Sequence, residues 1–105
     1  NRMNDLLRGA VRLHVLHHAA QAPVHGAWMA TELERHGYRI SPGTLYPALH
    51  RMELEGLIAS EKVVEAGRMR RTYRITEAGR TELADGIRTL TELARELLGP
   101  HEKNH

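Results

Sequence analysis

Three observations predict that this chain is mainly α-helical with one small β hairpin, an α+β fold. Apolar residues recur at three- and four-residue steps over most of the chain, which is the period of amphipathic helices. Two runs rich in β-branched residues, 57–65 and 69–75, flank the Gly-containing turn "AGR", as in a hairpin. A long helical pattern follows Thr76. The expected order is helix, helix, short strand, helix, hairpin, helix, which is that of a winged helix-turn-helix with an added C-terminal helix.

The composition narrows the class of protein. At 105 residues the chain is long enough for one domain with its own core. It has no Cys, which excludes disulfides and thiolate metal sites and suits the reducing cytoplasm, where we expect the protein to act. No apolar run reaches the roughly 18 residues of a membrane span, and no signal peptide is visible, so no membrane partner is expected. The net charge is only +2, so the placement of the basic residues matters more than their total.

The first helix is expected over residues 3–20 and carries two apolar rows. A helix that is apolar on most sides is usually buried on two fronts. We therefore expect it to contact its own domain and, on the other front, a second subunit. The two rows are Leu6, Ala10, Leu13, Leu16 and Ala20, and Leu7, Val11, Val15 and Ala19.

The second helix is expected over 27–36, after a connector at 21–26. Its inward residues are Met29, Ala30 and Leu33, and Gly37 is placed to stop it in the left-handed conformation. Residues 38–40 are expected to form a short extended piece.

The third helix has two faces. Ser41 is expected as its N-cap with Pro42 as the first helical residue, and Gly56 ends it. On a wheel of ~100° per residue, Leu54 falls on the polar side, and we expect it to turn back under the hairpin. The apolar stripe consists of Leu45, Ala48, Leu49 and Met52. The opposite, polar face carries Gly43, Thr44, Tyr46, Pro47, His50 and Arg51.

This polar face suits the base edges and phosphates of DNA, although simple solvation explains a polar helix face equally well. The hairpin favours DNA, because Arg68, Arg70 and Arg71 lie at its turn or just after it. Guanidinium groups there can bind phosphates or reach into a narrow minor groove. A protein-interaction module, the main alternative function, would not need these arginines. We find no nucleophile–base pair, paired carboxylates or phosphate loop, and therefore expect no enzyme.

The last helix is expected from the Thr76 cap to Gly99 and Pro100, and carries a coiled-coil-like seam. The seam can pack on the chain's own first helix or on a second subunit. We expect a homodimer, because so small a domain cannot cover so long a helix, and a twofold dimer predicts a pseudo-palindromic operator. The seam consists of Leu83, Ile87, Leu90, Ala94 and Leu97. The expected parts are a winged helix over 3–75, a dimerisation helix over 76–99 and a tail over 100–105.

The histidines and the single Trp leave two questions open. His14 and His18 have the i, i+4 spacing that can chelate a divalent metal, and His101 and His105 repeat it in the tail; purely structural histidines are the alternative. His17 lies in an apolar stripe and is expected to be packed. Trp28 either fills the core or lines a cleft for an organic effector. No cofactor is expected to be required.

Two segments, "SPGTLYPALHRMELEGL" and "GRMRRTYRITEAGR", resemble the PadR family of bacterial transcriptional regulators, and the similarity extends over roughly residues 6–90. The resemblance implies a homodimer of winged-helix subunits that usually represses and releases DNA when a small molecule binds between the subunits. With one helix after Thr76, the chain resembles the short subfamily. Ala27 stands where the family often has Tyr, with the aromatic moved to Trp28. The implied DNA contacts are Ser41, the polar face from Gly43 to Arg51 and the hairpin arginines from Arg68 to Arg71.

Overall fold

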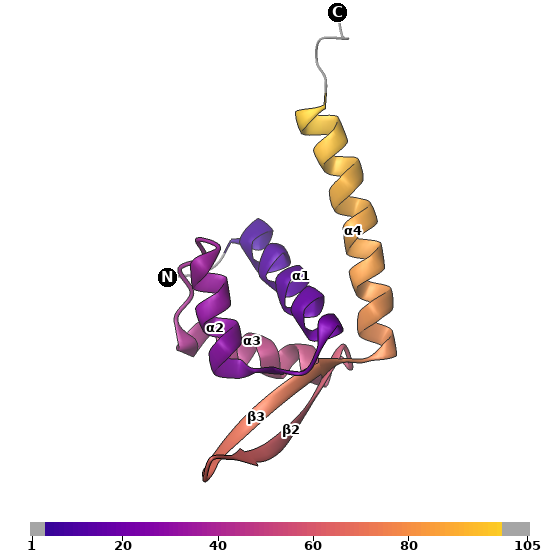
Figure 1. Ribbon diagram of the computed structural model, residues 1–105. Coiled ribbons are helices and arrows are strands. Elements are labelled where there is room, and N and C mark those ends of the chain that lie inside the picture. Colours follow the sequence, from indigo (N-terminus) through magenta and orange to yellow (C-terminus); the bar gives the residue numbers. More distant parts are fainter. Residues whose placement is uncertain (1–3, 100–105) are drawn as a thin grey trace, which may run out of the picture.

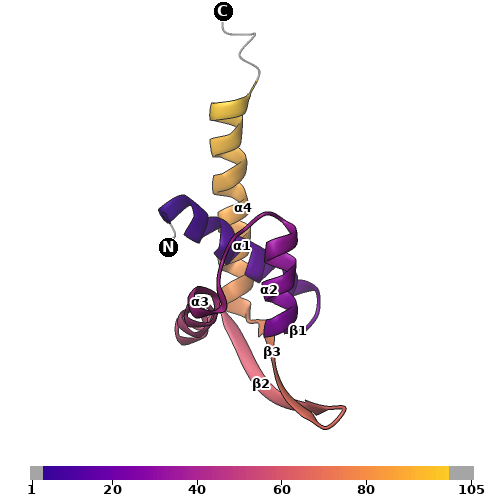
Figure 2. The same cartoon turned by 90° about the vertical axis from the view of Figure 1, so that its left-hand side faces the viewer.

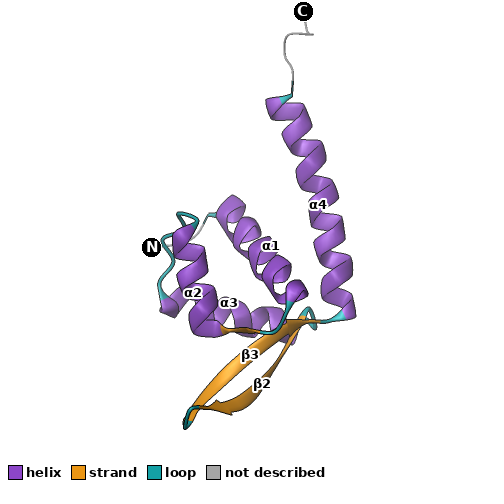
Figure 3. Cartoon of the chain, in the orientation of Figure 1, coloured by secondary structure: helices purple, strands orange, loops and turns teal. Residues whose placement is uncertain are grey.

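The computed structural model describes residues 4–99 and has the predicted α+β fold (Figure 1). Three helices pack together above a small sheet, and the last helix leaves the domain beside them and extends past them (Figure 3). The expectations for Met3 and for the tail at 100–105 lie outside the described residues. In chain order the elements are α1 (Asp5–Gln21), β1 (Val24–His25), α2 (Gly26–Arg35), α3 (Pro42–Leu54), β2 (Ile58–Glu65), β3 (Arg68–Ile75) and α4 (Glu77–Leu98).

The sheet has three antiparallel strands in the order β1-β3-β2. The prediction that 21–26 is only a connector was wrong, because Val24 pairs with Tyr73 and His25 with Thr72. The predicted extended piece at 38–40 is irregular and belongs to no strand. Tyr38 and Ile40 instead pack their side chains against the core. At Thr72 and Tyr73, β1 covers the edge of β3 that faces away from β2 and pairs the backbone groups there.

The β2–β3 hairpin turns through Ala66 and Gly67, whose φ angles are 51° and 75°. Positive φ at both central residues is the geometry of a two-residue type I′ turn, which matches the twist of the flanking strands. The strand register runs from the pair Ile58–Ile75 to the pair Glu65–Arg68. The hairpin thus begins at the core and ends in solvent.

The core lies between α1, α2, α3 and the base of the hairpin. The predicted inward residues of α2 are confirmed, since Met29 and Leu33 are each 1% exposed. The predicted apolar stripe of α3 is confirmed in full, because its buried residues are Leu45, Ala48, Leu49 and Met52. Burying this stripe fixes which way the opposite face of α3 points.

The end of α3 corrects one expectation and confirms another. Leu54 remains 73% exposed and does not turn back under the hairpin. Gly56 takes a φ of 80°, and the Leu57 N–H donates to the carbonyl of Met52 at 3.0 Å. This is the Schellman stop expected at a C-terminal glycine, and its apolar residue, Leu57, is the one that becomes buried. The apolar residue that follows the stop is therefore buried in the core, while the last residue of the helix stays in solvent.

The start of α3 has Ser41 at the N-cap position, as predicted. The Ser41 carbonyl accepts from the Leu45 N–H at 2.9 Å. The hydroxyl, however, donates to the Thr44 hydroxyl at 3.3 Å and caps no backbone N–H. Pro42 has no N–H, and the Thr44 N–H also donates to the Ser41 carbonyl at 2.9 Å, so backbone groups satisfy most of this helix start without a side-chain cap.

Helix α4 leaves the domain at Thr76, which caps it as predicted. The Thr76 hydroxyl accepts from the Gly79 N–H at 3.0 Å and donates to the Gly56 carbonyl at 2.6 Å. The first half of α4 lies beside α1, where Gly86 faces the Leu13 side chain. The second half extends beyond the other helices (Figure 2). Within residues 4–99, its large apolar side chains Leu90, Leu93, Leu97 and Leu98 are 43–80% exposed.

Candidate nucleic-acid interface and histidine cluster

The polar side of α3 forms an open surface on the domain. Six of the seven residues predicted to contact DNA there are exposed, and Thr44 is half-buried. Pro47 stands inside α3 without ending the helix, and Gly43 has only the Ser41 hydroxyl near the place of a Cβ. The backbone of the first two turns is therefore smooth enough for a close approach. The six exposed residues are Ser41, Gly43, Tyr46, Pro47, His50 and Arg51.

The Tyr46 ring packs against the backbone of Gly26, a glycine to which sequence analysis assigned no role. A Cβ on Gly26, the first residue of α2, would lie 2.9 Å from Cε1 of Tyr46 and 3.4 Å from Cε2 of Tyr73. The Tyr46 ring therefore leans on bare backbone and stays 40% exposed. The only signal in the sequence was the Gly in "VHGAW", which looks like part of a turn.

The hairpin arginines fall on two different faces of the sheet. Side chains alternate along a strand, so Arg71 shares the face of the buried Tyr73, while Arg70 points to the other side. The Arg70 Nε lies 3.8 Å from Oε1 of Glu65, which also lies 3.1 Å from Nε2 of His25. The predicted basic cluster therefore has two parts: Arg71 on the face of the sheet that packs on the core, and Arg68 and Arg70 on the opposite face.

A short polar network connects α3 to the hairpin. The Ser60 hydroxyl donates to the Glu53 carboxylate at 2.8 Å and accepts from the Arg71 guanidinium at 3.0 Å. The Ser60 N–H donates to the same carboxylate at 3.2 Å. Charge-assisted hydrogen bonds of this kind fix side-chain geometry. The bonds from Ser60 to Glu53 therefore hold the hairpin against α3, and Arg71 joins them through the Ser60 hydroxyl.

The two predicted parts of the interface meet in a cavity of about 220 Å³. It places Tyr46 from α3 beside arginines of β3 and the start of α2. The lining residues are His25, Gly26, Ala27, Tyr46, Arg68, Met69, Arg70 and Arg71.

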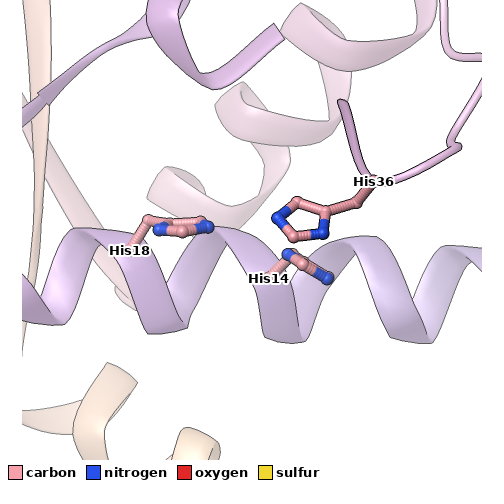
Figure 4. Close-up of side chains that lie close together, drawn as sticks. All are labelled: His14, His18 and His36. Atoms are coloured by element: carbon pink, nitrogen blue, oxygen red, sulfur yellow. The ribbon is translucent and has the colours of Figure 1, made fainter. Parts of the chain in front are cut away.

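A second cluster lies between α1 and the end of α2, away from this interface. His14 and His18 project from one side of α1, and His36 reaches them from the C-cap of α2 (Figure 4). Each offers one nitrogen, and these three atoms lie within 4.8 Å of one another. The Glu32 carboxylate lies 3.0 Å from Nε2 of His36 and 3.6 Å from Nε2 of His18. The sequence suggested His14 and His18 by their spacing, but His36 and Glu32 had no signal, because only the fold brings α2 against them.

Two buried nitrogens of this cluster lack a hydrogen bond within the described residues. The Nδ1 of His14 and the Nε2 of His18 are buried and accept or donate no hydrogen bond within residues 4–99. Burial lowers the pKa of His14 below its ordinary value, and the neighbouring His36 lowers it further. Burial likewise lowers the pKa of His18, with a smaller contribution from His17. Both imidazoles are therefore neutral at pH 7, with buried nitrogens that cost about 1–3 kcal/mol each when unpaired.

Two single residues overturn packing expectations. His17 was expected to be packed, but it is exposed, and its Nε2 lies 3.2 Å from Nε2 of Gln21. The buried face of α1 is instead made by Val11, Val15 and their neighbours. Trp28 does not fill the core, since it is 43% exposed and its ring meets the His18 ring edge-on at 5.2 Å. The alternative for Trp28, an effector cleft, remains a prediction.

The predicted seam of α4 is divided between the domain and solvent. Leu83 packs against the core, and Ala94 is half-buried. Ile87, Leu90 and Leu97 are 50%, 54% and 60% exposed. A groove of about 670 Å³ separates α4 from α1, lined by apolar side chains such as Leu6, Leu13 and Leu93. This groove and the seam form one apolar surface, which we call the α1–α4 surface.

Comparison with known proteins shows the family to which this chain is similar. The family described as "Transcriptional regulator PadR-like family" matches residues 15–85. The transcriptional regulator Rv3488 of Mycobacterium tuberculosis is 62% identical over 97 residues, which cover 92% of this chain and 91% of that protein. Within residues 4–99, no helix has both the length and the apolar character needed to cross a membrane.

Two solved structures show the same fold. The PadR-like transcriptional regulator BC4206 of Bacillus cereus has a TM-score of 0.78 and 28% identity, covering 92% of this chain and 99% of that one. Bacillus subtilis PadR, solved in complex with operator DNA, has a TM-score of 0.67 and 17% identity. That match covers 74% of this chain and 47% of the PadR chain, and shows the fold alone.

Proposed function

The chain belongs to the PadR-like family of transcriptional regulators, and from this premise we propose that it is a repressor that binds a pseudo-palindromic operator as a homodimer. In this proposal residues 3–75 form the DNA-binding winged helix and residues 76–99 the dimerisation helix. The protein acts in the cytoplasm, catalyses no reaction, and leaves DNA when a small molecule or a divalent metal binds.

The observation that carries the proposal is the meeting of the polar face of α3 with the arginines of β3. Tyr46 lines the same cavity as Arg70 and Arg71. Hydroxyl, imidazole and guanidinium groups on the first turns of a helix can reach base edges in the major groove. Arginines on the adjoining hairpin can bind the phosphates beside it. The operator complex of Bacillus subtilis PadR supports this use of the fold.

The proposed DNA contacts divide into two kinds. Contacts with base edges specify the sequence, whereas contacts with phosphates position the protein on the duplex. We assign the hairpin arginines Arg68, Arg70 and Arg71 to phosphates. The proposed contacts of α3 are Ser41, Gly43, Thr44, Tyr46, Pro47, His50 and Arg51, of which we assign Tyr46 and Arg51 to base edges.

The homodimer is supported by the α1–α4 surface. Exposed large apolar side chains grouped on one surface mark interaction sites in soluble proteins. A second copy of α4 laid in the groove would cover Leu90 and Leu97, and twofold symmetry would place two α3 helices on one side of the dimer. Half-sites about one helical turn apart, or a multiple of it, follow from that symmetry.

A gel shift with DNA from upstream of the protein's own gene tests the proposal. We expect a complex that weakens steeply as salt rises, because arginine–phosphate contacts release counterions. A scrambled duplex of equal length and composition is the control for sequence specificity. A winged helix that binds only proteins, the second candidate, would give no salt-sensitive complex with either duplex.

A further inference from the structure

We propose that His14, His18 and His36, with Glu32 as the fourth ligand, form a binding site for a divalent transition-metal ion between α1 and α2. The site is separate from the DNA-binding surface. Its existence does not depend on the proposed function, and only its regulatory consequence rests on that function.

The geometry needs only small side-chain movements to close on an ion. The three ligand nitrogens lie within 4.8 Å of one another. In a tetrahedral zinc site with Zn–N bonds of about 2.0–2.1 Å, ligand nitrogens lie about 3.3 Å apart. His14 and His18 stand one helical turn apart on α1, and His36 faces them from a different segment (Figure 4). Rotation of the imidazoles can supply the difference of about 1.5 Å, because the His36 side chain is exposed at the end of α2 and has room to turn.

Glu32 supplies the oxygen that completes the set. Its carboxylate already lies 3.0 Å from Nε2 of His36 and 3.6 Å from Nε2 of His18. Its side chain is only 12% exposed, and while Oε1 lies 3.5 Å from Nε of Arg35, Oε2 is the oxygen that faces the histidines. Three imidazoles and one carboxylate suit Zn²⁺, Co²⁺ or Ni²⁺, whereas Mg²⁺ and Ca²⁺ prefer oxygen ligands.

Two nitrogens of the cluster are buried, namely Nδ1 of His14 and Nε2 of His18. A buried nitrogen that has lost its hydrogen bonds to water destabilises the fold unless it gains another partner. The buried nitrogens of these two residues also have no hydrogen-bond partner within the described part of the chain. A bound ion would satisfy atoms that the fold otherwise leaves unpaired.

The position of His36 connects the site to the rest of the molecule. His36 lies at the C-cap of α2, and the chain then runs through Tyr38 to the N-cap of α3 at Ser41. The Tyr38 ring meets the His14 ring edge-on at 5.1 Å, and both residues line the groove between α1 and α4. An ion that ties His36 to α1 therefore fixes the segment leading into α3 and one wall of the proposed dimer interface. We expect zinc to change the affinity for the operator.

Calorimetry of the full chain, freed of metal and titrated with zinc chloride, tests the site. We expect one tight binding event per chain. In the variant His36→Ala the zinc affinity should fall by at least roughly tenfold. His36 is the variant of choice because it is exposed at a helix end, so its loss does not open the core. His17→Ala is the matched control, since the exposed His17 ring lies beside the His18 ring, with centroids 4.9 Å apart, but contributes no nitrogen to the cluster.

The outcomes separate the site from other histidines. His101 and His105, beyond the described residues, are present in every variant, so any zinc they bind is a constant background. Absence of heat in the wild type, or equal zinc affinity in the wild type and His36→Ala, overturns the site. Titration with Co²⁺ gives an independent readout, because a tetrahedral site produces strong visible absorption that His36→Ala should lose.

The regulatory consequence needs a separate measurement. Gel shifts of the wild type and His36→Ala, with and without zinc, should show a zinc-dependent affinity only in the wild type. Equal zinc effects in both proteins, or none in either, overturn the regulatory consequence. If no operator complex forms at all, the proposed function fails, while calorimetry still decides whether the metal site exists.

Discussion

At the scale of single residues, Tyr46 and Arg51 carry the sharpest expectation for DNA recognition. Both are exposed on the polar face of α3, while their neighbours Leu45 and Met52 are each 1% exposed. The changes Tyr46→Ala and Arg51→Ala should each weaken operator binding by about 1–3 kcal/mol, because a lost base contact costs that much. Gel shifts on the operator and on a scrambled duplex measure the effect, which should be much smaller on the scrambled DNA. An equal loss on both duplexes would assign these residues to phosphates.

Gly26 provides a test of how Tyr46 is positioned. The change Gly26→Ala places a Cβ within 2.9 Å of the Tyr46 ring, which must then move outward. We expect operator affinity to fall by about 1 kcal/mol, although Gly26 itself need not touch DNA, while the midpoint of thermal unfolding changes little because the ring is free to move.

A double-mutant cycle separates this effect from direct contact. If Gly26 acts through the Tyr46 ring, Gly26→Ala should have no further effect in a Tyr46→Ala background. Additive losses of operator affinity would contradict that explanation.

At the scale of elements, the phosphate contacts proposed for the hairpin predict how DNA affinity depends on salt. Arg70→Ala should lower affinity for all DNA and reduce the slope of log affinity against log salt by about 1, because one phosphate contact is lost. The Ser60→Ala change is the matched control: it removes the link between Arg71 and Glu53 but no charge. It should leave the salt slope unchanged. A salt slope that is unaffected by Arg70→Ala would place Arg70 off the DNA.

Elements also show where sequence reasoning succeeds. The α3 helix was predicted correctly in its cap position, buried stripe and stop, because 3.6-residue periodicity, Pro42 and Gly56 are local signals. The segment Val24–His25 was missed, because a two-residue strand has no periodicity and exists only through its pairing with β3. His36 and Glu32 joined the histidine cluster for a similar reason, since the contact between α1 and α2 is a tertiary one. Local signals thus predict elements, while partners across the fold come from packing.

The same limit applies to exposure. His17 and Leu54 were expected to be covered. A helical wheel shows the direction in which a side chain points but not whether another element of the fold lies in that direction. In the structure the α1 side at His17 faces solvent, and Leu54 stays exposed while Leu57 is buried. The prediction for the α3 stripe was correct because four apolar residues on one side of the helix together determine which side is buried.

At the scale of the whole molecule, the length of α4 decides whether one chain is sufficient. The second half of this helix extends beyond α1, α2 and α3 (Figure 1). Leu97 is 60% exposed there, so placing a charge on it costs the single chain little. Burying the exposed part of Leu97 in a dimer, by contrast, would be worth about 1–2 kcal/mol per copy. The change Leu97→Glu should therefore leave the fold intact and weaken the dimer.

Sedimentation velocity over a concentration series measures this effect. The wild type should sediment as a dimer, and Leu97→Glu should shift toward the monomer at the same concentration. The control is Thr91→Glu, which adds the same charge to an exposed position about 120° around the helix. It should remain dimeric. A dimeric Leu97→Glu variant, or a monomeric wild type, would contradict the assignment of the α1–α4 surface to a second copy.

The dimer prediction extends to DNA, because symmetry links the two α3 helices. One recognition helix contacts one half-site, so a monomer loses the second set of contacts together with the effective concentration that tethers it. Leu97→Glu should therefore lose most of its affinity for the full operator but bind an isolated half-site as the wild-type subunit does. Shifting the half-site spacing by five base pairs, about half a helical turn, should weaken the wild type in the same way. If the wild type tolerates that shift, the two α3 helices are not held in one rigid dimer.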